Sequence, residues 1–334
     1  MSEPGAHMKS ELAEAPGVFA STISNAVTPF NAAQLAELRP KAIYTIARGS
    51  SDAAANILSY EFMRETGLPM TSLPPSIFSV GRGVAMDSAL ALVVSQSGAS
   101  NDLVLSAKGA KARGATVIGL INAAGSPVSE HAHLTLPIGA GPELAVPATK
   151  SVIGSIAAGM ALLSHLAPAY AARATASAQA FTDLPALPQA KPILSALLRA
   201  NHVYVIGRDT GYGAAQELAL KLKETCAIHA EAYSSSEVLH GPLQLATNPL
   251  LILILDTEQP DVQASLDTAE ARFKAAGGTT HRIRPSDIGA ENLTPAAAAA
   301  MLLCLSYPLV LATALALGHD PDRPETLSKV TQTI

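Results

Sequence analysis

The sequence predicts an α/β protein built from two tandem, doubly wound parallel-sheet lobes. Short apolar runs of strand length alternate with helical patterns, which is typical of a parallel sheet covered by helices on both faces. A Pro-rich stretch at residues 183–192 interrupts this alternation, and the pattern then restarts. Six residues of the restart match earlier residues at a constant offset, which points to an internal duplication. Tyr204, Ile206, Arg208, Ala214, Ala215 and Leu218 repeat Tyr44, Ile46, Arg48, Ala54, Ala55 and Leu58.

The expected domain boundaries follow from this restart. Residues 1–40 are a loose or helical lead-in, residues 41–182 the first lobe, 183–192 the linker and 193–334 the second lobe. A chain of 334 residues is long enough for two domains with complete cores. Its 49% hydrophobic but only 4% aromatic content is typical of a soluble protein packed through small side chains.

The individual elements can be placed from their periodicity. Strands of the first lobe are expected at residues 42–46, 90–94, 117–121 and 134–137, with helices at 52–66, 101–113 and 149–165. Gly67 and Pro69 end the first of these helices. In the second lobe, strands are expected near residues 203–206, 250–255 and 281–283, with a helix at 262–276.

Residues 296–318 carry no charge and are long enough to span a bilayer. However, this segment contains Pro308, is mostly Ala, and lacks flanking Lys or Arg residues and an aromatic belt. A buried helix in an α/β core is therefore the favoured interpretation.

Charge and cysteine usage exclude several classes of protein. The net charge of −5, without a basic cluster, argues against a nucleic-acid partner. Cys226 and Cys304 lie far apart, so neither a disulfide framework nor a zinc site is indicated. The first 17 residues lack the apolar core and cleavage site of a signal peptide. A cytoplasmic protein without a metal, a cofactor or a membrane partner is expected.

Residues Ser95 to Ser100, SQSGAS, join an expected strand to an expected helix. Open α/β sheets bind ligands at this edge, and helix N-termini present free N–H groups to anions. The three Ser hydroxyls are further donors, and Gly98 allows close approach of the backbone. The pattern alone fits a phosphate site and an ordinary Ser-rich helix cap equally well. The absence of a P-loop Lys disfavours a nucleoside triphosphate.

Glu217, Lys221 and Glu224 lie at positions i, i+4 and i+7 of an expected helix, so they project from one face. Spacing alone favours a solvated face with an ion pair. The segment from Ile228 to Pro242 has little helical periodicity, however, and it gathers further titratable residues. Carboxylate, ammonium and imidazole groups near one another are suited to proton transfer on a small polar substrate.

These segments resemble the SIS-domain sugar isomerase family. The short motifs KLKE, IHAEAY and ExxHGP occur in the same order as in the isomerase half of glucosamine-6-phosphate synthase and its stand-alone relatives. The resemblance covers nearly the whole chain from residue 40 and implies two flavodoxin-like lobes. SQSGAS is similar to the SQSGET phosphate loop of the family, with Ala99 in place of the Glu and Ser100 keeping the hydroxyl. Ser50 and Ser51 match the GTS turn, in which one hydroxyl faces the sugar phosphate.

Two further segments match the family. ELAVPATK, from Glu143 to Lys150, resembles the EIGVASTK segment that lies over the sugar, but Pro147-Ala148 replaces Ala-Ser and a substrate-facing hydroxyl is missing. Residues 327–331 resemble the tail whose Lys closes over the active site. The resemblance implies a set of substrate- and phosphate-binding positions, namely Ser50, Ser51, Ser95, Gln96, Ser97, Ser100, Val146 and Ala148.

The resemblance also implies catalytic roles for five residues. Glu224 would be the base that moves a proton between C2 and C1 of the sugar. Lys221 would hold Glu224 ionised or polarise the substrate, and Glu217 would position both. His240 would open the sugar ring, and because it serves the neighbouring subunit in the family, a homodimer is implied. Lys329 would approach the reacting oxygens from the C-terminal tail.

The implied activity is that of an amino-sugar-phosphate deaminase-isomerase acting on glucosamine 6-phosphate. The synthase carries an N-terminal glutaminase domain with a catalytic Cys, whereas this chain starts with Met1 and Ser2. Synthesis of ammonia from glutamine is therefore not expected.

Several alternatives share the same residues. They are galactosamine 6-phosphate deamination, fructosamine 6-phosphate deglycation and plain aldose–ketose isomerisation of a phosphosugar. A sugar-phosphate sensor is the non-enzyme alternative. A lead-in of about 40 residues is too short and too acidic to supply a DNA-binding helix-turn-helix. The joint presence of Glu224, Lys221 and His240 also favours catalysis.

Overall fold

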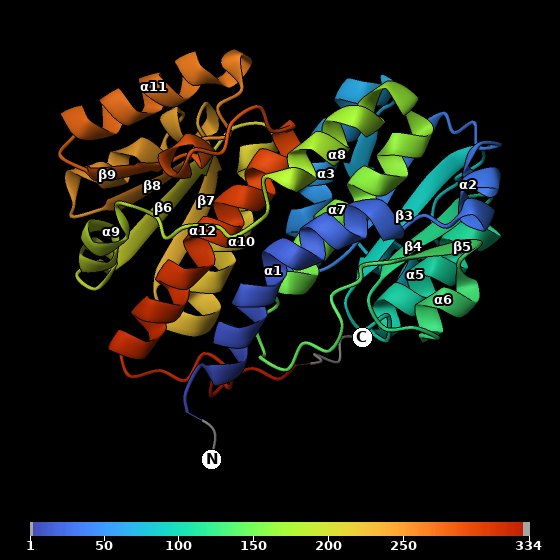
Figure 1. Cartoon of the computed structure of the whole chain (residues 1–334), viewed down its shortest axis with the longest axis horizontal. Helices are drawn as coiled ribbons and strands as arrows, with labels where there is room; N and C mark the ends of the chain where they lie inside the picture. The colour runs from blue at the N-terminus through green and yellow to red at the C-terminus, as the bar shows by residue number, and fades with distance from the viewer. Residues whose placement is uncertain (1–2, 330–334) are drawn as a thin grey trace.

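The computed structural model describes residues 3–329 and contains two parallel β-sheets, one in each lobe (Figure 1). The first sheet has the strand order β2-β1-β3-β4-β5 and consists of β1 (Ala42–Ile46), β2 (Met70–Ser72), β3 (Ala89–Ser95), β4 (Thr116–Ile121) and β5 (Leu134–Pro137). The second has the order β7-β6-β8-β9 and consists of β6 (His202–Gly207), β7 (His229–Ser234), β8 (Leu251–Leu255) and β9 (Thr279–Ile283). The predicted fold class is confirmed.

The two edge strands β2 and β7 are missing from the sequence-based prediction. β2 has only three residues, which is too short for a periodic pattern. β7 reads HAEAYS and contains no β-branched residue. It forms because its backbone pairs with β6 in parallel register, from His202 opposite His229 to Gly207 opposite Ser234. Tertiary pairing therefore decides the structure of this segment.

Helices cover both sheets. They are α1 (Ala6–Asn25), α2 (Pro29–Leu35), α3 (Gly49–Thr66), α4 (Ser76–Ser79), α5 (Asn101–Ala112), α6 (Pro127–His131), α7 (Lys150–Leu166), α8 (Ala171–Gln179), α9 (Ala190–Leu197), α10 (Thr210–Cys226), α11 (Pro260–Ala275) and α12 (Pro295–Ala316). Helix α9 begins inside the predicted linker, so residues 190–192 are helical rather than linker. Pro192 is accepted there because the first turn of a helix needs no N–H donor.

The two lobes share one hydrophobic core. Helix α10 of the second lobe packs against α3 of the first lobe and against α12, and α3 also packs against α7. Alternate residues of each buried strand face opposite sides of the sheet. Leu90 and Leu92 of β3 accordingly join the shared core, whereas Ala91 and Val93 face α5 in a separate outer cluster that includes Leu103.

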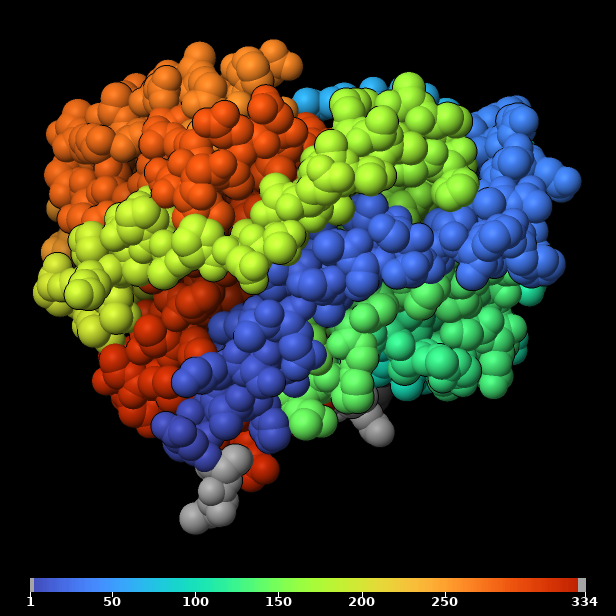
Figure 2. All heavy atoms as spheres, viewed as in Figure 1, coloured from blue at the N-terminus to red at the C-terminus, as the bar shows by residue number. Residues whose placement is uncertain are grey.

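The N-terminal lead-in is an integral part of this core. Met8, Ala15 and Phe19 of α1 are buried, and the helix packs against α7 and α12. Figure 2 shows α1, in blue, lying obliquely across the molecule, with the yellow-green segment that connects the lobes beside it. The carboxylate of Asp322 accepts hydrogen bonds of 2.8 Å from the N–H groups of His7 and Met8. The C-terminal segment therefore caps the first helix.

Helix α12 corresponds to the uncharged segment predicted to be buried. By length and composition it could cross a membrane, but 78% of its most apolar window is buried inside the protein. Tyr307, Met301 and Leu302 on this helix are fully buried. The helix thus belongs to the shared core of the two lobes.

Glu61 is a buried carboxyl at the junction of the lobes. It lies on α3, its side chain is fully buried, and Oε2 accepts a 3.0 Å hydrogen bond from the N–H of Ala296 at the start of α12. Oε1 is buried without a hydrogen-bond partner among residues 3–329. Burial raises the pKa of Glu61 to about 7, although nearby Tyr170 and the N–H of Ala296 act in the opposite direction. Glu61 therefore binds its proton more tightly in the folded than in the unfolded chain.

This shift predicts a pH dependence of stability. The folded state binds more protons than the unfolded state between about pH 4.5 and pH 7, so stability falls as the pH rises through this window, by roughly 3 kcal/mol for Glu61 at most. Glu61→Gln should remove this contribution and flatten the profile. The free energy of unfolding in urea, measured at pH 5.5 and pH 8 for both proteins, tests it. Equal pH slopes for variant and wild type would contradict the assignment.

Candidate active site

A cavity of about 360 Å³ opens at the C-terminal edge of the first sheet, where β1 and β3 lie side by side and lead into helices on opposite sides. This is the point at which open α/β sheets bind ligands. Its wall contains all eight predicted binding positions together with Glu224 and Lys329. The full lining is Arg48, Gly49, Ser50, Ser51, Val94, Ser95, Gln96, Ser97, Ser100, Leu103, Val146, Ala148, Glu224, Leu327, Ser328 and Lys329.

The Ser-rich loop after β3 has the geometry of an anion site. Gly98 has φ +59°, and a Cβ atom there would lie 2.2 Å from the hydroxyl of Ser126, so only glycine fits. The Ser95 hydroxyl accepts a 3.0 Å hydrogen bond from the Gly98 N–H, which holds the turn. Ser100 is the N-cap of α5, but its side chain makes no capping hydrogen bond. Within residues 3–329, the N–H groups of Asn101 and Asp102 and the Ser100 hydroxyl make no hydrogen bond, so they are available to an anion at this helix start, whereas the Leu103 N–H is paired.

A second helix begins beside this loop. Helix α3 starts at Gly49, three residues earlier than predicted, so Ser50 and Ser51 lie in its first turn. Arg48, which the sequence-based set of site residues omits, precedes the helix and also lines the cavity. The only sequence signal for it is its match to Arg208 in the duplicated pattern. Two helix N-termini and a guanidinium thus converge on one space.

Glu217, Lys221 and Glu224 share one face of α10, but this face is not solvated. The side chains of Glu217 and Lys221 are 0% exposed, and that of Glu224 is 25% exposed. The Lys221 ammonium donates a short hydrogen bond to Glu224 and lies 3.6 Å from Glu217. Tyr307 of α12 donates a 3.1 Å hydrogen bond to Glu217. Only Glu224 of the three reaches the cavity wall, with the other two beneath it.

The burial of this cluster perturbs its titration. Burial raises the pKa of Glu217 to about 7, an effect that Lys221 opposes and Glu224 reinforces, while Ser50 and the Tyr307 hydroxyl lower this pKa somewhat. Burial would lower the pKa of Lys221, but the Glu217 and Glu224 carboxylates outweigh it and raise this pKa. Lys221 therefore stays protonated next to the one carboxylate that faces the cavity.

Residues 143–150 form the wall of the cavity next to the C-terminal tail. Val146 and Ala148 line the cavity, and buried Glu143 accepts hydrogen bonds from the N–H groups of Thr149 and Ser151 at 3.0 and 3.1 Å. Lys329 Nζ donates a 2.5 Å bond to the Ala145 carbonyl and lies 3.5 Å from Glu143. Glu143 is thus a second residue missing from the sequence-based set. Its sequence signal is its place at the start of the ELAVPATK segment, which matches the family. Val330 and Thr331 of the predicted tail lie outside the described residues.

His240 lies elsewhere within the chain. It follows the 3-10 helix Glu237–Leu239 on the loop after β7, its side chain is exposed, and it does not line the cavity. A single chain therefore brings Glu224, Lys221, Lys329 and the serines together but leaves His240 apart.

Within residues 3–329, no group of three or more His, Cys, Asp or Glu side chains could hold a metal ion.

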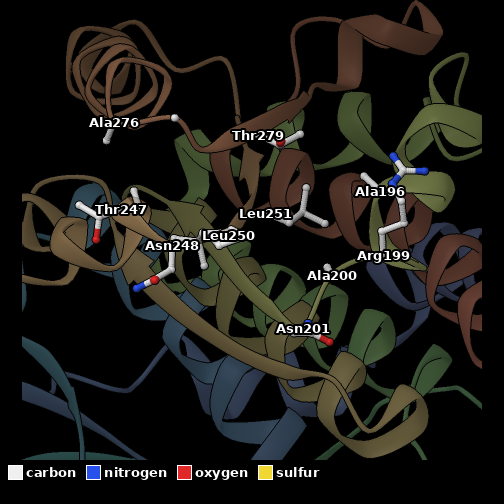
Figure 3. Close-up of a pocket in the computed structure, with 13 residues that line it drawn as sticks. Ala196, Arg199, Ala200, Asn201, Thr247, Asn248, Leu250, Leu251, Ala276 and Thr279 are labelled. Atoms are coloured by element: carbon white, nitrogen blue, oxygen red, sulfur yellow. The ribbon is translucent and has the colours of Figure 1, made fainter.

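A larger hollow of about 460 Å³ lies at the N-terminal edge of the second sheet, next to the first residues of β8 and β9 (Figure 3). Its lining is mainly Ala, Thr, Asn and Leu, and Arg199 is its only charged member in the described part of the chain. Without a carboxylate, an imidazole or an ammonium group, it offers no means of proton transfer. The cavity at the edge of the first sheet is therefore the candidate active site.

The chain is similar to known proteins over most of its length. The SIS domain family model matches residues 38–165 and 196–283. The chain is 30% identical to the glutamine–fructose-6-phosphate aminotransferase (isomerizing) of Symbiobacterium thermophilum, over 90% of this chain and 52% of that protein. The chain thus spans about half the length of the curated relatives it matches.

Solved structures resemble the whole chain. A Silicibacter pomeroyi protein, provisionally assigned as a phosphosugar isomerase, superposes with a TM-score of 0.78 and 32% identity, covering 95% of this chain and 99% of its own. The glucosamine-6-phosphate deaminase of Thermotoga maritima gives a TM-score of 0.76 at 20% identity, covering 98% and 100%, and so shows the fold alone. Since the family model also matches more than half of the sequence, the chain belongs to the SIS domain family.

Proposed function

We propose that the chain is a glucosamine-6-phosphate deaminase of the SIS type, which converts glucosamine 6-phosphate and water to fructose 6-phosphate and ammonia. One observation carries this proposal: the Glu224 carboxylate, held by the buried Lys221 ammonium, faces the same cavity as the Ser-rich start of α5. A base and a phosphate-binding helix start in one cavity suit a phosphorylated sugar that undergoes proton transfer.

The proton transfer is assigned to Glu224. In the open-chain sugar, the C2 hydrogen is acidic because it is adjacent to the C1 aldehyde. Glu224 takes this proton and O1 gains one from solvent, which gives an enolamine. Glu224 then returns its proton to C1 while the amine nitrogen releases one to solvent, which leaves an imine at C2. The positive charge of Lys221 beside Glu224 stabilises the negative charge that develops on the substrate. Water then adds to the C2 imine, and ammonia leaves to give the ketone.

Ring opening is assigned to His240 of a second subunit. His240 is exposed and lies away from the cavity of its own chain, so its participation requires a homodimer in which it enters the partner's cavity. Lys329 belongs to the chain that provides Glu224, and its bond to the Ala145 carbonyl holds it at the cavity. We place this enzyme in the cytoplasm, and the reaction uses a hydrolytic step but no cofactor or metal.

The Thermotoga maritima deaminase has the same fold, so this fold can support deamination, but the Silicibacter pomeroyi protein shares it as well. Deamination of galactosamine 6-phosphate, deglycation of fructosamine 6-phosphate and plain aldose–ketose isomerisation use the same proton transfer and remain the enzymatic alternatives. A sugar-phosphate sensor would bind these compounds without turnover. Ammonia release from glucosamine 6-phosphate and from galactosamine 6-phosphate, measured side by side with the formation of ketose phosphate, separates all of them.

The assignment of the base predicts the effect of Glu224→Gln. This variant should still bind the substrate but lose roughly two to four orders of magnitude in kcat, because the amide cannot accept the C2 proton. Steady-state ammonia release measures the loss, and Glu37→Gln, which changes an exposed carboxylate outside the cavity, is the matched control. A kcat above about one tenth of wild type would assign the base to another residue.

The phosphate loop predicts a change in KM. Ser97→Ala and Ser100→Ala should each weaken productive binding of the sugar phosphate by about 1.5–3 kcal/mol, the size of one hydrogen bond to a charged group. Ser164→Ala is the control, because within the described part of the chain this hydroxyl bonds only to the Met160 carbonyl of its own helix. Unphosphorylated glucosamine should not be a substrate, and equal turnover of it would remove the phosphate site from the mechanism.

The composite site predicts complementation between two inactive variants. Mixing Glu224→Gln with His240→Asn should restore activity, because each heterodimer contains one site with an intact Glu224 and an intact His240. Random pairing makes about half of the molecules heterodimers with one whole site each, so recovery should approach roughly a quarter of wild-type activity.

Native mass spectrometry of the mixture must confirm that subunits have exchanged. Absence of recovery after complete exchange would place Glu224 and His240 in the site of one chain. A fully active monomer in solution would refute the shared site more directly.

A further inference from the structure

Arg48 is the charged group of the cavity that the proposed mechanism leaves without a task. It lies between the two helix starts, since it directly precedes α3 and its Nε donates a 2.8 Å hydrogen bond to Asp102 in the first turn of α5. The Arg48 side chain is 51% exposed and lines the cavity. Within residues 3–329, its Nη1 and Nη2 atoms make no hydrogen bond, so the outer edge of the guanidinium is available to a ligand.

Asp102 fixes the orientation of this guanidinium. Its side chain is 0% exposed, and its second oxygen accepts a 2.9 Å hydrogen bond from the N–H of Leu103. A buried carboxylate is costly unless it is paired, so the fold retains Asp102 only together with its Arg48 partner. Because the two opposite charges largely cancel, the pair supplies directed donors more than net positive charge.

We propose that Arg48 is a further phosphate-binding residue and that Asp102 is its positioning residue, an inference that rests on the proposed function. Nη1 and Nη2 of Arg48 donate to oxygens of the substrate phosphate, which the start of α5 holds from another side through Ser97 and Ser100. The planar guanidinium fork matches two phosphate oxygens, and prior fixation by Asp102 reduces the entropy lost on binding. The cavity thereby selects a dianionic phosphate ester over a neutral sugar.

The test measures binding without turnover. The probe is a hexitol 6-phosphate, which has no carbonyl group and cannot react, and its affinity is measured by isothermal titration calorimetry. Arg48→Met should weaken binding by roughly ten- to hundredfold, as expected for loss of hydrogen bonds to a charged group. At saturating substrate, kcat should change much less than KM. Arg173→Met is the matched control, because Arg173 is similarly exposed and paired with Glu65 at 2.6 Å, but does not line the cavity.

Asp102→Asn distinguishes the positioning of Arg48 from a simple effect of net charge on phosphate binding. Removing the negative charge beside Arg48 would tighten phosphate binding if only net charge mattered, whereas loss of positioning should weaken it several-fold. Arg48→Lys keeps the charge but loses the fork, so it should also bind the hexitol phosphate more weakly than wild type. It provides a second measurement if Arg48→Met proves unstable in thermal unfolding.

The failure of this inference and that of the proposed function can be told apart. Equal affinity of wild type, Arg48→Met and Arg48→Lys for the hexitol phosphate would overturn the role of Arg48. Tight binding by wild type without ammonia release would refute the proposed reaction, and the comparison of the Arg48 variants would still decide the inference. A wild-type protein that binds no hexitol phosphate would overturn both.

Discussion

The buried ammonium of Lys221, placed beside the carboxylates of Glu217 and Glu224, is the interaction on which the candidate site depends. An ammonium removed from water is strongly destabilising unless carboxylates compensate it. Glu217 in turn requires Tyr307 of α12 and is influenced by Ser50 of α3. The charge cluster therefore depends on the packing of α10 against α3 and α12. The contact between the lobes and the chemistry of the cavity thus have the same structural origin.

The sequence predicted those parts of the fold that have a strong local pattern. Buried strands such as β1 and β3 are continuous apolar runs, and α12 is an uncharged apolar helix, so their positions followed from composition and periodicity. The edge strand β7 could not be found in this way, because Ala and Glu residues form a strand only through pairing with β6. Helix α1 was equally ambiguous, since its order depends on contacts with α7 and on capping by Asp322.

The same distinction applies to the site. The Ser-rich loop and the α10 face were recognisable because their residues are close in sequence. Arg48, Glu143 and Tyr307 were not, because each acts on a residue that is far away in the chain: Asp102, Lys329 and Glu217 respectively. The burial of the α10 face could not be predicted from the sequence either. Spacing alone favoured a solvated face for Glu217 and Lys221, and only the packing of α10 between other helices excludes it.

The internal duplication explains why this cavity belongs to the first lobe. The loop after β8 corresponds to the Ser-rich loop after β3, but it begins with Asp256, which is fully buried. The Asp256 carboxylate accepts hydrogen bonds from Arg282 and Arg284 at 2.9 and 3.1 Å, and from Gln263 and the N–H of Glu258 at 2.7 and 2.8 Å. Ion pairs within the second lobe therefore occupy the C-terminal end of β8, where an anionic ligand would otherwise bind. The second lobe contributes instead through α10, the duplicate of α3, which carries Glu224 to the cavity of the first lobe.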